Sequence, residues 1–243
     1  MNALNMANVV ARCKAAGTAA FSAIGLDVKI RRDRLMCLRS YGVRTVLDIG
    51  ANTGQFARQA RSLFPRAKVF SFEPIPECLS GLAKTMKGDP EFTAVPFALG
   101  AEEGSSTLYC SSFSPSSSLL NMCELHRQCF PRSAETHPLP IRVVRLDSWA
   151  LEHDLLLPML VKMDVQGYED RVIEGGALTI SRATLLMIEM SFAELYEGQP
   201  LFDDIYERVK SLGFRLILTL GNLYDSHSGR LLQCDAVFAN EKT

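Results

Sequence analysis

The chain has 243 residues, of which 47% are hydrophobic and 22% are charged, with a formal net charge of −1. It is long enough to form one large α/β domain with a substantial core. The near-neutral balance and the lack of a lysine- or arginine-rich run argue against a nucleic-acid partner. Seven cysteines, an odd number without CxxC spacing, favour reduced thiols and a cytoplasmic protein.

We expect residues 1–42 to form a helical extension. Residues 6–28 are rich in alanine and valine, but Arg12 and Lys14 interrupt them. The uncharged run 15–26 is too short to span a bilayer, so no transmembrane segment is predicted; its length also suits the apolar part of a signal peptide. An amphipathic helix that packs on the domain is the favoured reading. Its candidate partners are a second copy in a homodimer, a carrier or a membrane surface, and the sequence does not select among them.

Strands and helices alternate through residues 43–243, which predicts one domain with a mainly parallel sheet covered on both faces. A further helical pattern at 31–41 precedes them. The final two strands form a hairpin, so one edge strand should be antiparallel. Strands are expected at 43–49, 68–72, 92–99, 141–146, 159–164, 185–190, 214–220 and 231–238, and helices at 55–64, 76–87, 168–174 and 201–212.

The middle of the chain, 104–140, interrupts this alternation. Eight serines fall within residues 105–118, and prolines punctuate the stretch that follows. The segment reads either as a surface linker or as a loop that covers an active site, since long loops in compact domains are often functional. Ser117 and Ser118 are candidates for contacts to substrate hydroxyls, with a flexible polar loop as the alternative.

The motif VLDIGANTGQFA places Asp48, Gly50, Asn52 and Gly54 where a strand turns into a helix. Glycines in such a turn let the backbone approach a ligand closely. The dinucleotide pattern G-x-G-x-x-G and the P-loop are both absent. A carboxylate at position 48 would repel a pyrophosphate but attract an ammonium group, such as the amino-acid end of S-adenosylmethionine.

Glu73 ends the next strand, nineteen residues after Gly54. An acid at this position can accept hydrogen bonds from both ribose hydroxyls of a nucleoside. The alternative is a cap on the following helix. Phe97 and Ala98, after the third strand, fall where a ring face and a backbone group would suit an adenine, with ordinary core packing as the alternative.

Several motifs together resemble the FkbM-type methyltransferases. They are LDIGANTGQF, FEPIPE, VPFALG, RLDSW, KMDVQGYEDRVIEGG, IEM and the terminal GRLLQCDAVFAN, which span about Val43 to Asn240. The resemblance implies a doubly wound, Rossmann-like domain whose seven-stranded sheet has an antiparallel C-terminal strand. It also implies S-adenosylmethionine as cofactor and methyl transfer to a hydroxyl of a sugar or a polyketide-like natural product. The acceptor would be a hydroxylated or glycosylated small molecule, whose identity the resemblance does not give.

Asp164 follows the strand MLVKM and precedes Gln166 and Gly167. Ligands of open α/β sheets bind outside the carboxyl ends of the strands, so Asp164 is placed to face the transferred methyl group. A base that removes the hydroxyl proton would accelerate the reaction by ~10²–10⁴. Gln166 could orient the acceptor. The alternative makes Asp164 a helix cap and Gln166 and Gly167 turn residues.

An unperturbed aspartate, with a pKa of ~3.9, is a weak base, which leaves the proton acceptor open. An aspartate that the fold buries would be a stronger base. A divalent cation held by Asp164, Glu189 and Asp147 could acidify the hydroxyl instead, but these residues lack compact ligand spacing, so metal use is undecided. His137, in the irregular segment, is the histidine candidate, although an isolated histidine is more often solvated or packed.

Two other functions remain open at the level of sequence. An NAD-dependent oxidoreductase would need the missing third glycine and would tolerate Asp48 poorly. A cofactor-binding module without catalysis would keep Asp48 and Glu73 essential for binding while Asp164→Asn had no effect on turnover. The methyltransferase interpretation ranks first.

Overall fold

The computed structural model describes residues 34–111, 114–130, 133, 135–225 and 228–242. The chain divides into two compact units, residues 1–36 and 37–243. The expected helix within 6–28 and the homodimer through it lie outside the described residues. The helical pattern at 31–41 corresponds to a 3₁₀ helix, η1, at Arg34–Tyr41. The description below concerns the second unit.

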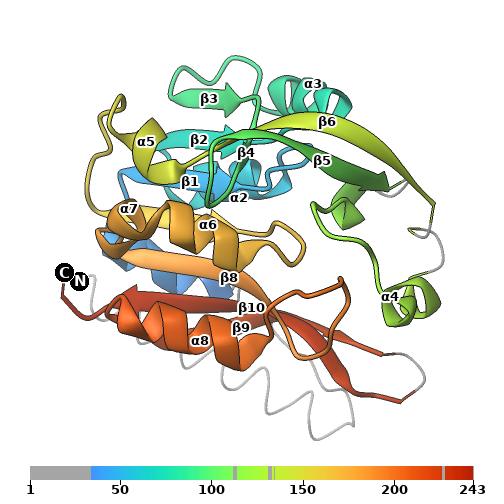
Figure 1. The fold of residues 1–243 in the computed structure, drawn as a ribbon. Helices are drawn as coiled ribbons and strands as arrows, with labels where there is room; N and C mark the ends of the chain where they lie inside the picture. The colour runs from blue at the N-terminus through green and yellow to red at the C-terminus, as the bar shows by residue number, and fades with distance from the viewer. Residues whose placement is uncertain (1–33, 112–113, 131–132, 134, 226–227, 243) are drawn as a thin grey trace, which may run out of the picture. The chain divides into compact units, whose positions relative to one another are not determined.

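A seven-stranded sheet forms the centre of this unit, in the order β3-β2-β1-β7-β8-β10-β9 (Figure 1). All pairs from β3 to β8 are parallel, whereas β10 is antiparallel to both of its neighbours. The predicted α/β fold with an antiparallel C-terminal strand is therefore confirmed. The strands are β1 Thr45–Ile49, β2 Lys68–Phe72, β3 Phe92–Val95, β7 Met159–Met163, β8 Leu185–Ser191, β9 Phe214–Tyr224 and β10 Leu231–Asn240.

The expectation of an antiparallel edge strand is wrong in one respect. The antiparallel strand β10 inserts between β8 and β9, and β9 takes the edge. The hairpin order alone left this placement open, because either strand of a hairpin can pair with the existing sheet.

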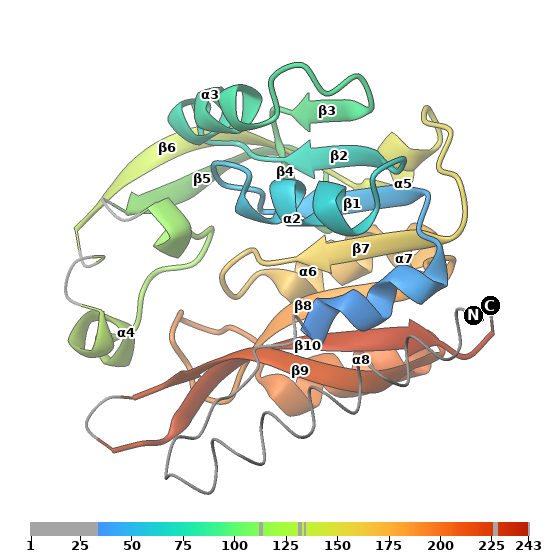
Figure 2. The same cartoon turned by 180° about the vertical axis from the view of Figure 1, so that it is seen from behind.

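Helices cover both faces of the sheet (Figures 1 and 2). One face carries α5 Leu146–Ala150, α6 Glu169–Gly175, α7 Ala177–Ser181 and α8 Phe202–Ser211, and the other carries α2 Gln55–Leu63 and α3 Pro76–Thr85. Every residue of β1 and β7 is buried, as expected for strands enclosed on both sides.

A second, three-stranded sheet occupies much of the segment that the sequence predicts to be irregular. Its order is β4-β6-β5, with β4 at Ala98–Leu99, β5 at Gly104–Ser111 and β6 at Thr136–Val144. The single strand expected at 92–99 is therefore two short strands in different sheets, and the serine-rich segment begins as a strand. Serine-rich strands lack the apolar alternation that would reveal them, so only their pairing partner does.

Two prolines lie inside β6, which is longer than the predicted 141–146. Pro138 and Pro140 face Tyr109 and Thr107 of β5, in the part of β6 that β4 does not reach. Proline cannot donate to a strand ladder and is tolerated at a free edge. The remaining short elements of this region are η2 Ser114–Ser116 and α4 Glu124–Cys129.

Candidate active site

A cavity of about 380 Å³ opens at the carboxyl ends of the parallel strands. Its size falls within the range of small-molecule and cofactor sites, ~300–1,000 Å³. Strand ends from both halves of the main sheet contribute to its lining, including Ile49 of β1, Phe72 of β2 and Glu189 of β8. Ligands of open α/β sheets bind at this position, where the strand order reverses.

The turn after β1 forms one wall of the cavity and requires its glycines. Gly50 has φ +75°, and a Cβ atom on it would collide with the carbonyl oxygen of Asp164, at the end of the neighbouring strand. Gly54 has φ +94° and packs against Leu82. Asn52 also has positive φ, which asparagine tolerates better than most residues, and its side-chain oxygen accepts from the Thr53 amide.

Glu73 lines the cavity next to this turn and is 4% exposed. One carboxylate oxygen accepts from the backbone N–H of Asn52 at 2.8 Å, and the other accepts from that of Ile75 at 2.9 Å. Ile75 is the N-cap residue of α3, so Glu73 supports the start of the helix and also faces the cavity. Burial raises the pKa of Glu73 to about 7, although both backbone hydrogen bonds oppose the shift.

This raised pKa predicts a specific dependence of stability on pH. The folded protein holds the Glu73 proton up to about pH 7, whereas the unfolded chain releases it near the ordinary value of 4.5. The contribution to stability is therefore largest below pH 4.5 and is lost as the pH rises towards 7. Because glutamine does not titrate, Glu73→Gln should gain roughly 2–3 kcal/mol in free energy of unfolding relative to wild type between pH 5 and pH 8.

Urea unfolding of both proteins at the two pH values measures this change. Glu77→Gln is the matched control, because Glu77 is exposed in the first turn of α3 and does not line the cavity. Equal pH dependence in wild type and Glu73→Gln would contradict the prediction.

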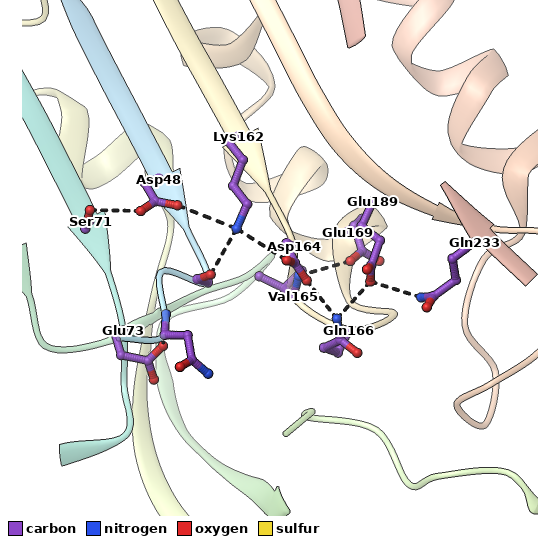
Figure 3. Close-up of polar contacts among 12 residues, drawn as sticks. Asp48, Ser71, Glu73, Lys162, Asp164, Val165, Gln166, Glu169, Glu189 and Gln233 are labelled. Atoms are coloured by element: carbon purple, nitrogen blue, oxygen red, sulfur yellow. Dashed lines mark hydrogen bonds and ion pairs between the residues drawn. The ribbon is translucent and has the colours of Figure 1, made fainter. Parts of the chain in front are cut away.

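Asp48 lies below the cavity and does not line it. Its side chain is fully buried, accepts a hydrogen bond from Ser71 at 3.0 Å and lies 3.5 Å from the ammonium nitrogen of Lys162 (Figure 3). Burial raises the pKa of Asp48, with Lys162 and Ser71 opposing the shift. Lys162, and not Asp48 as the sequence predicts, is therefore the residue of this pair that lines the cavity.

Lys162 is the most informative residue that sequence reasoning missed. It is 7% exposed, donates to the carbonyl of Gly50 at 3.0 Å and lies 3.5 Å from the carboxylates of both Asp48 and Asp164. Burial alone would lower the pKa of Lys162, but the nearby carboxylates outweigh it and raise that pKa, so the ammonium stays charged. A lysine inside an otherwise apolar strand was the signal in the sequence that could have identified it.

Asp164, Gln166 and Glu189 form the other end of the cavity (Figure 3). The amide nitrogen of Gln166 donates to Asp164 at 2.7 Å and to Glu189 at 2.8 Å. The Asp164 side chain is 34% exposed. Burial, followed by the charge of Asp164, raises the pKa of Glu189 well above its ordinary value. Two carboxylates thus lie side by side, joined by one amide.

The Asp164 carboxylate does not act as a cap on the following helix, α6, which was the alternative for this residue. No side chain caps α6 through its N-cap residue Tyr168, and the Asp164 carboxylate binds Gln166 and Lys162. Glu169, which the sequence suggests to be favourable with the helix dipole, is 4% exposed and accepts from the backbone N–H groups of Val165 and Gly167. Burial raises the pKa of Glu169 to about 7. Glu169 therefore holds the turn, which leaves the Asp164 carboxylate facing the cavity.

Strand β10 contributes residues that sequence reasoning did not place at the site, and the serine-rich segment contributes Ser114 besides the predicted Ser117. Asp235 of β10 lines the cavity, and burial raises its pKa to about 6. Gln233, two residues earlier, donates to Glu189 at 3.0 Å. Ser114 and Ser117 also line the cavity, with the hydroxyl of Ser114 3.1 Å from the side-chain nitrogen of Asn52. The segment around 114–118 thus covers the site, as the second reading of that segment predicts.

The remaining candidates are distributed differently. Ala98 lines the cavity, whereas Phe97 packs against the core with its ring centroid 6.0 Å from that of Phe72. His137 lies exposed on β6 opposite Cys110 and does not line the cavity. Asp147 accepts from the backbone N–H groups of residues 178 and 179 at the start of α7. The structure therefore does not bring His137 or Asp147 to the site.

Among the residues that the structure describes, no group of three or more His, Cys, Asp or Glu side chains is arranged to hold a metal ion. The described residues likewise contain no helix that is both long and apolar enough to cross a bilayer.

A match to a known protein family covers most of the residues that line the cavity. Residues 48–216 match the family described as Methyltransferase FkbM domain, which is more than half of the chain. The chain belongs to the FkbM methyltransferase family. The resemblance noted in the motifs is thereby confirmed, and the matched range includes Asp48, Glu73, Asp164 and Glu189.

One curated relative is the 2-O-methyltransferase NoeI of Sinorhizobium fredii (strain NBRC 101917 / NGR234). It is 31% identical over 160 residues, which cover 63% of this chain and 66% of that protein. Solved structures with a related outline include an rRNA methylase from Streptococcus thermophilus (11% identity, TM-score 0.48, 88% of this chain and 99% of that chain). Another is the magnesium protoporphyrin IX methyltransferase ChlM from Synechocystis PCC 6803 with bound SAM (12% identity, TM-score 0.47, 86% of this chain and 77% of that chain).

Proposed function

We propose that this protein is an S-adenosylmethionine-dependent O-methyltransferase that acts on a hydroxylated small molecule. The observation that carries the proposal is one cavity with two chemically different ends. Glu73 lies at the end suited to a nucleoside, and Asp164 and Glu189 lie at the end suited to an acceptor hydroxyl (Figure 3). The glycine turn joins the two ends, since Asn52 donates to Glu73 and Gly50 lies against Asp164. Membership of the FkbM family supports the same reaction class.

The residues at the first end fit the cofactor. Each oxygen of Glu73 already accepts one backbone N–H, and a carboxylate has further lone pairs free for two ribose hydroxyls. Apolar side chains of Ile75, Leu99 and Leu108 line the same cavity and suit the faces of a purine base. Lys162 offers a positive charge to the carboxylate of the cofactor's amino-acid end, so Asp48 would act through Lys162.

S-adenosylmethionine, when bound, supplies a methyl group on a sulfonium that is open to in-line displacement. The protein's main contribution is to orient the acceptor oxygen, which is worth up to ~7–11 kcal/mol when the geometry is ideal. Asp164, exposed to the cavity and held by Gln166, accepts the hydroxyl proton as the new bond forms. Glu189, whose pKa is raised by burial, is the second proton acceptor at this end.

The acceptor is proposed to be a sugar or a similar hydroxylated natural product. Carboxylates and amides line the second end of the cavity. Carboxylates accept hydrogen bonds from hydroxyls, and amides both donate to them and accept from them, so several hydroxyls can be bound at once. The relative named as a 2-O-methyltransferase supports transfer to oxygen.

Calorimetric titration with S-adenosylhomocysteine tests the cofactor assignment. We expect saturable binding at micromolar concentration, at least tenfold weaker binding by Glu73→Gln, and wild-type binding by the exposed control Glu77→Gln. NADH, titrated in parallel, should not bind. A folded wild-type protein that ignores S-adenosylhomocysteine, or that prefers NADH, would refute the proposal.

A further inference from the structure

The amide of Gln166 is held from three sides. Its nitrogen donates to both cavity carboxylates, and its oxygen accepts from the hydroxyl of Tyr196 at 2.8 Å. The backbone of Gln166 has φ +57°, which is uncommon for a residue other than glycine, and its carbonyl accepts from Ser118 at 2.7 Å. Neighbouring segments therefore determine both the backbone and the side-chain conformation of this residue.

The orientation of the Gln166 amide decides whether it attracts or repels the carboxylates of Asp164 and Glu189. With its nitrogen between the carboxylates, Gln166 donates two charge-assisted hydrogen bonds. A rotation of the amide by half a turn would instead place its carbonyl oxygen against two carboxylate oxygens. Because Tyr196 donates its proton to the oxygen of Gln166, it selects the first orientation. The carbonyl of Ser116, at 3.2 Å, is the more distant acceptor for the single Tyr196 proton.

His126 supports Tyr196 from behind. It lies on α4, is 3% exposed, and has its Nε2 atom 3.3 Å from the Tyr196 hydroxyl oxygen. Burial lowers the pKa of His126 to about 4, so the ring is neutral at pH 7 and carries one N–H. The Nε2–H tautomer complements the network, because it donates to the Tyr196 oxygen while Tyr196 donates onward.

We propose that Tyr196 and His126 are positioning residues, whose hydrogen bonds orient the Gln166 amide so that it holds Asp164 and Glu189 side by side. That Tyr196 and His126 contribute to catalysis rests on the proposed methyl transfer. Their hydrogen bonds to Gln166 and to each other do not depend on it. Neither residue lines the cavity. They act on the acceptor end through Gln166 and leave the Glu73 end untouched.

Tyr196→Phe removes the hydroxyl while keeping the ring that packs beside Met122 and Leu195. We expect the Gln166 amide to lose its fixed orientation and the two carboxylates to separate. The acceptor end should then be misplaced, with kcat falling about 10-fold to 100-fold while the Kd for S-adenosylhomocysteine stays within twofold. His126→Leu should act in the same direction with a smaller loss, and it serves as the second variant if Tyr196→Phe folds poorly.

The side-chain amide signals of Gln166 provide a readout that does not depend on activity. In protein labelled with ¹⁵N-glutamine, Gln166→Glu assigns the pair of signals by removing it. We expect these signals to be slow to exchange with water in wild type and to become fast in Tyr196→Phe. Leu195→Val is the matched control, because it loosens the same cluster without touching the Tyr196 hydroxyl.

The outcomes separate positioning from general stability. Fast amide exchange in Tyr196→Phe with protected signals in Leu195→Val supports the proposal, even if wild-type protein transfers no methyl group and the proposed function fails. Amide signals that are unchanged in both Tyr196→Phe and His126→Leu would overturn it. Equal loss of protection in Leu195→Val would also overturn it, because the role of Tyr196 would then be packing alone.

Discussion

Asp164→Asn is expected to lower kcat by about 10²–10⁴-fold, the usual contribution of a positioned proton acceptor. Asparagine keeps the size of the side chain and can still accept from Gln166, but it cannot take the acceptor's proton at neutral pH. Because Asp164 lies at the acceptor end of the cavity, the Kd for S-adenosylhomocysteine should change little. Initial rates at saturating cofactor and acceptor measure the loss.

Two further variants locate the effect. Asp154→Asn is the matched control, because Asp154 is a surface residue with a 76% exposed side chain paired to Lys68. Glu189→Gln tests whether the second carboxylate shares the role, and we expect a smaller loss than for Asp164→Asn. Full activity in Asp164→Asn would refute its assignment as the base and would leave a cofactor-binding role for the site.

Lys162→Met is expected to lower the free energy of unfolding by about 3–5 kcal/mol, the range observed when one partner of a buried ion pair is removed. The fully buried carboxylate of Asp48 would then keep only its hydrogen bond from Ser71. The carbonyl of Gly50 would also lose the donor that holds the glycine turn. Urea unfolding followed by circular dichroism measures the change.

A double variant shows whether the buried charge is the cause. Asp48→Asn combined with Lys162→Met removes both charges, so it should recover part of the stability lost in the single variant. Lys68→Met is the control, because the exposed pair of Lys68 and Asp154 is worth ~1 kcal/mol or less. A double variant less stable than Lys162→Met would contradict this account, since the loss would then come from packing.

Elements with strong local signals were predictable almost to the residue. Strand β2 was expected at 68–72 and is found at Lys68–Phe72, and α2 was expected at 55–64 and is found at Gln55–Leu63. In both, the spacing of apolar residues and a flanking glycine or proline mark the ends. The run at 92–99 carries such a mark in Pro96, which the prediction of one strand passed over; Pro96 and Phe97 turn the chain from one sheet into another.

In the site, too, local motifs located some residues, whereas the contacts between them depend on the fold. The sequence places Gly50, Glu73 and Asp164 at strand ends, and these residues do line one cavity. It could not decide which carboxylate binds the turn after β7, since Asp164 and Glu169 both stand near enough along the chain. The structure assigns the backbone N–H groups of that turn to Glu169.

The sequence by itself therefore determined the fold class, the family and the strand ends at which a cofactor would bind, because these depend on local periodicity and on short motifs. Only the tertiary structure decided that Lys162 lies between Asp48 and Asp164, and that Tyr196 and His126 reach Gln166. Except for the pair of Lys162 and Asp164, these contacts join segments that are far apart along the chain. Which polar groups meet there depends on packing and burial, which no local pattern of residues encodes.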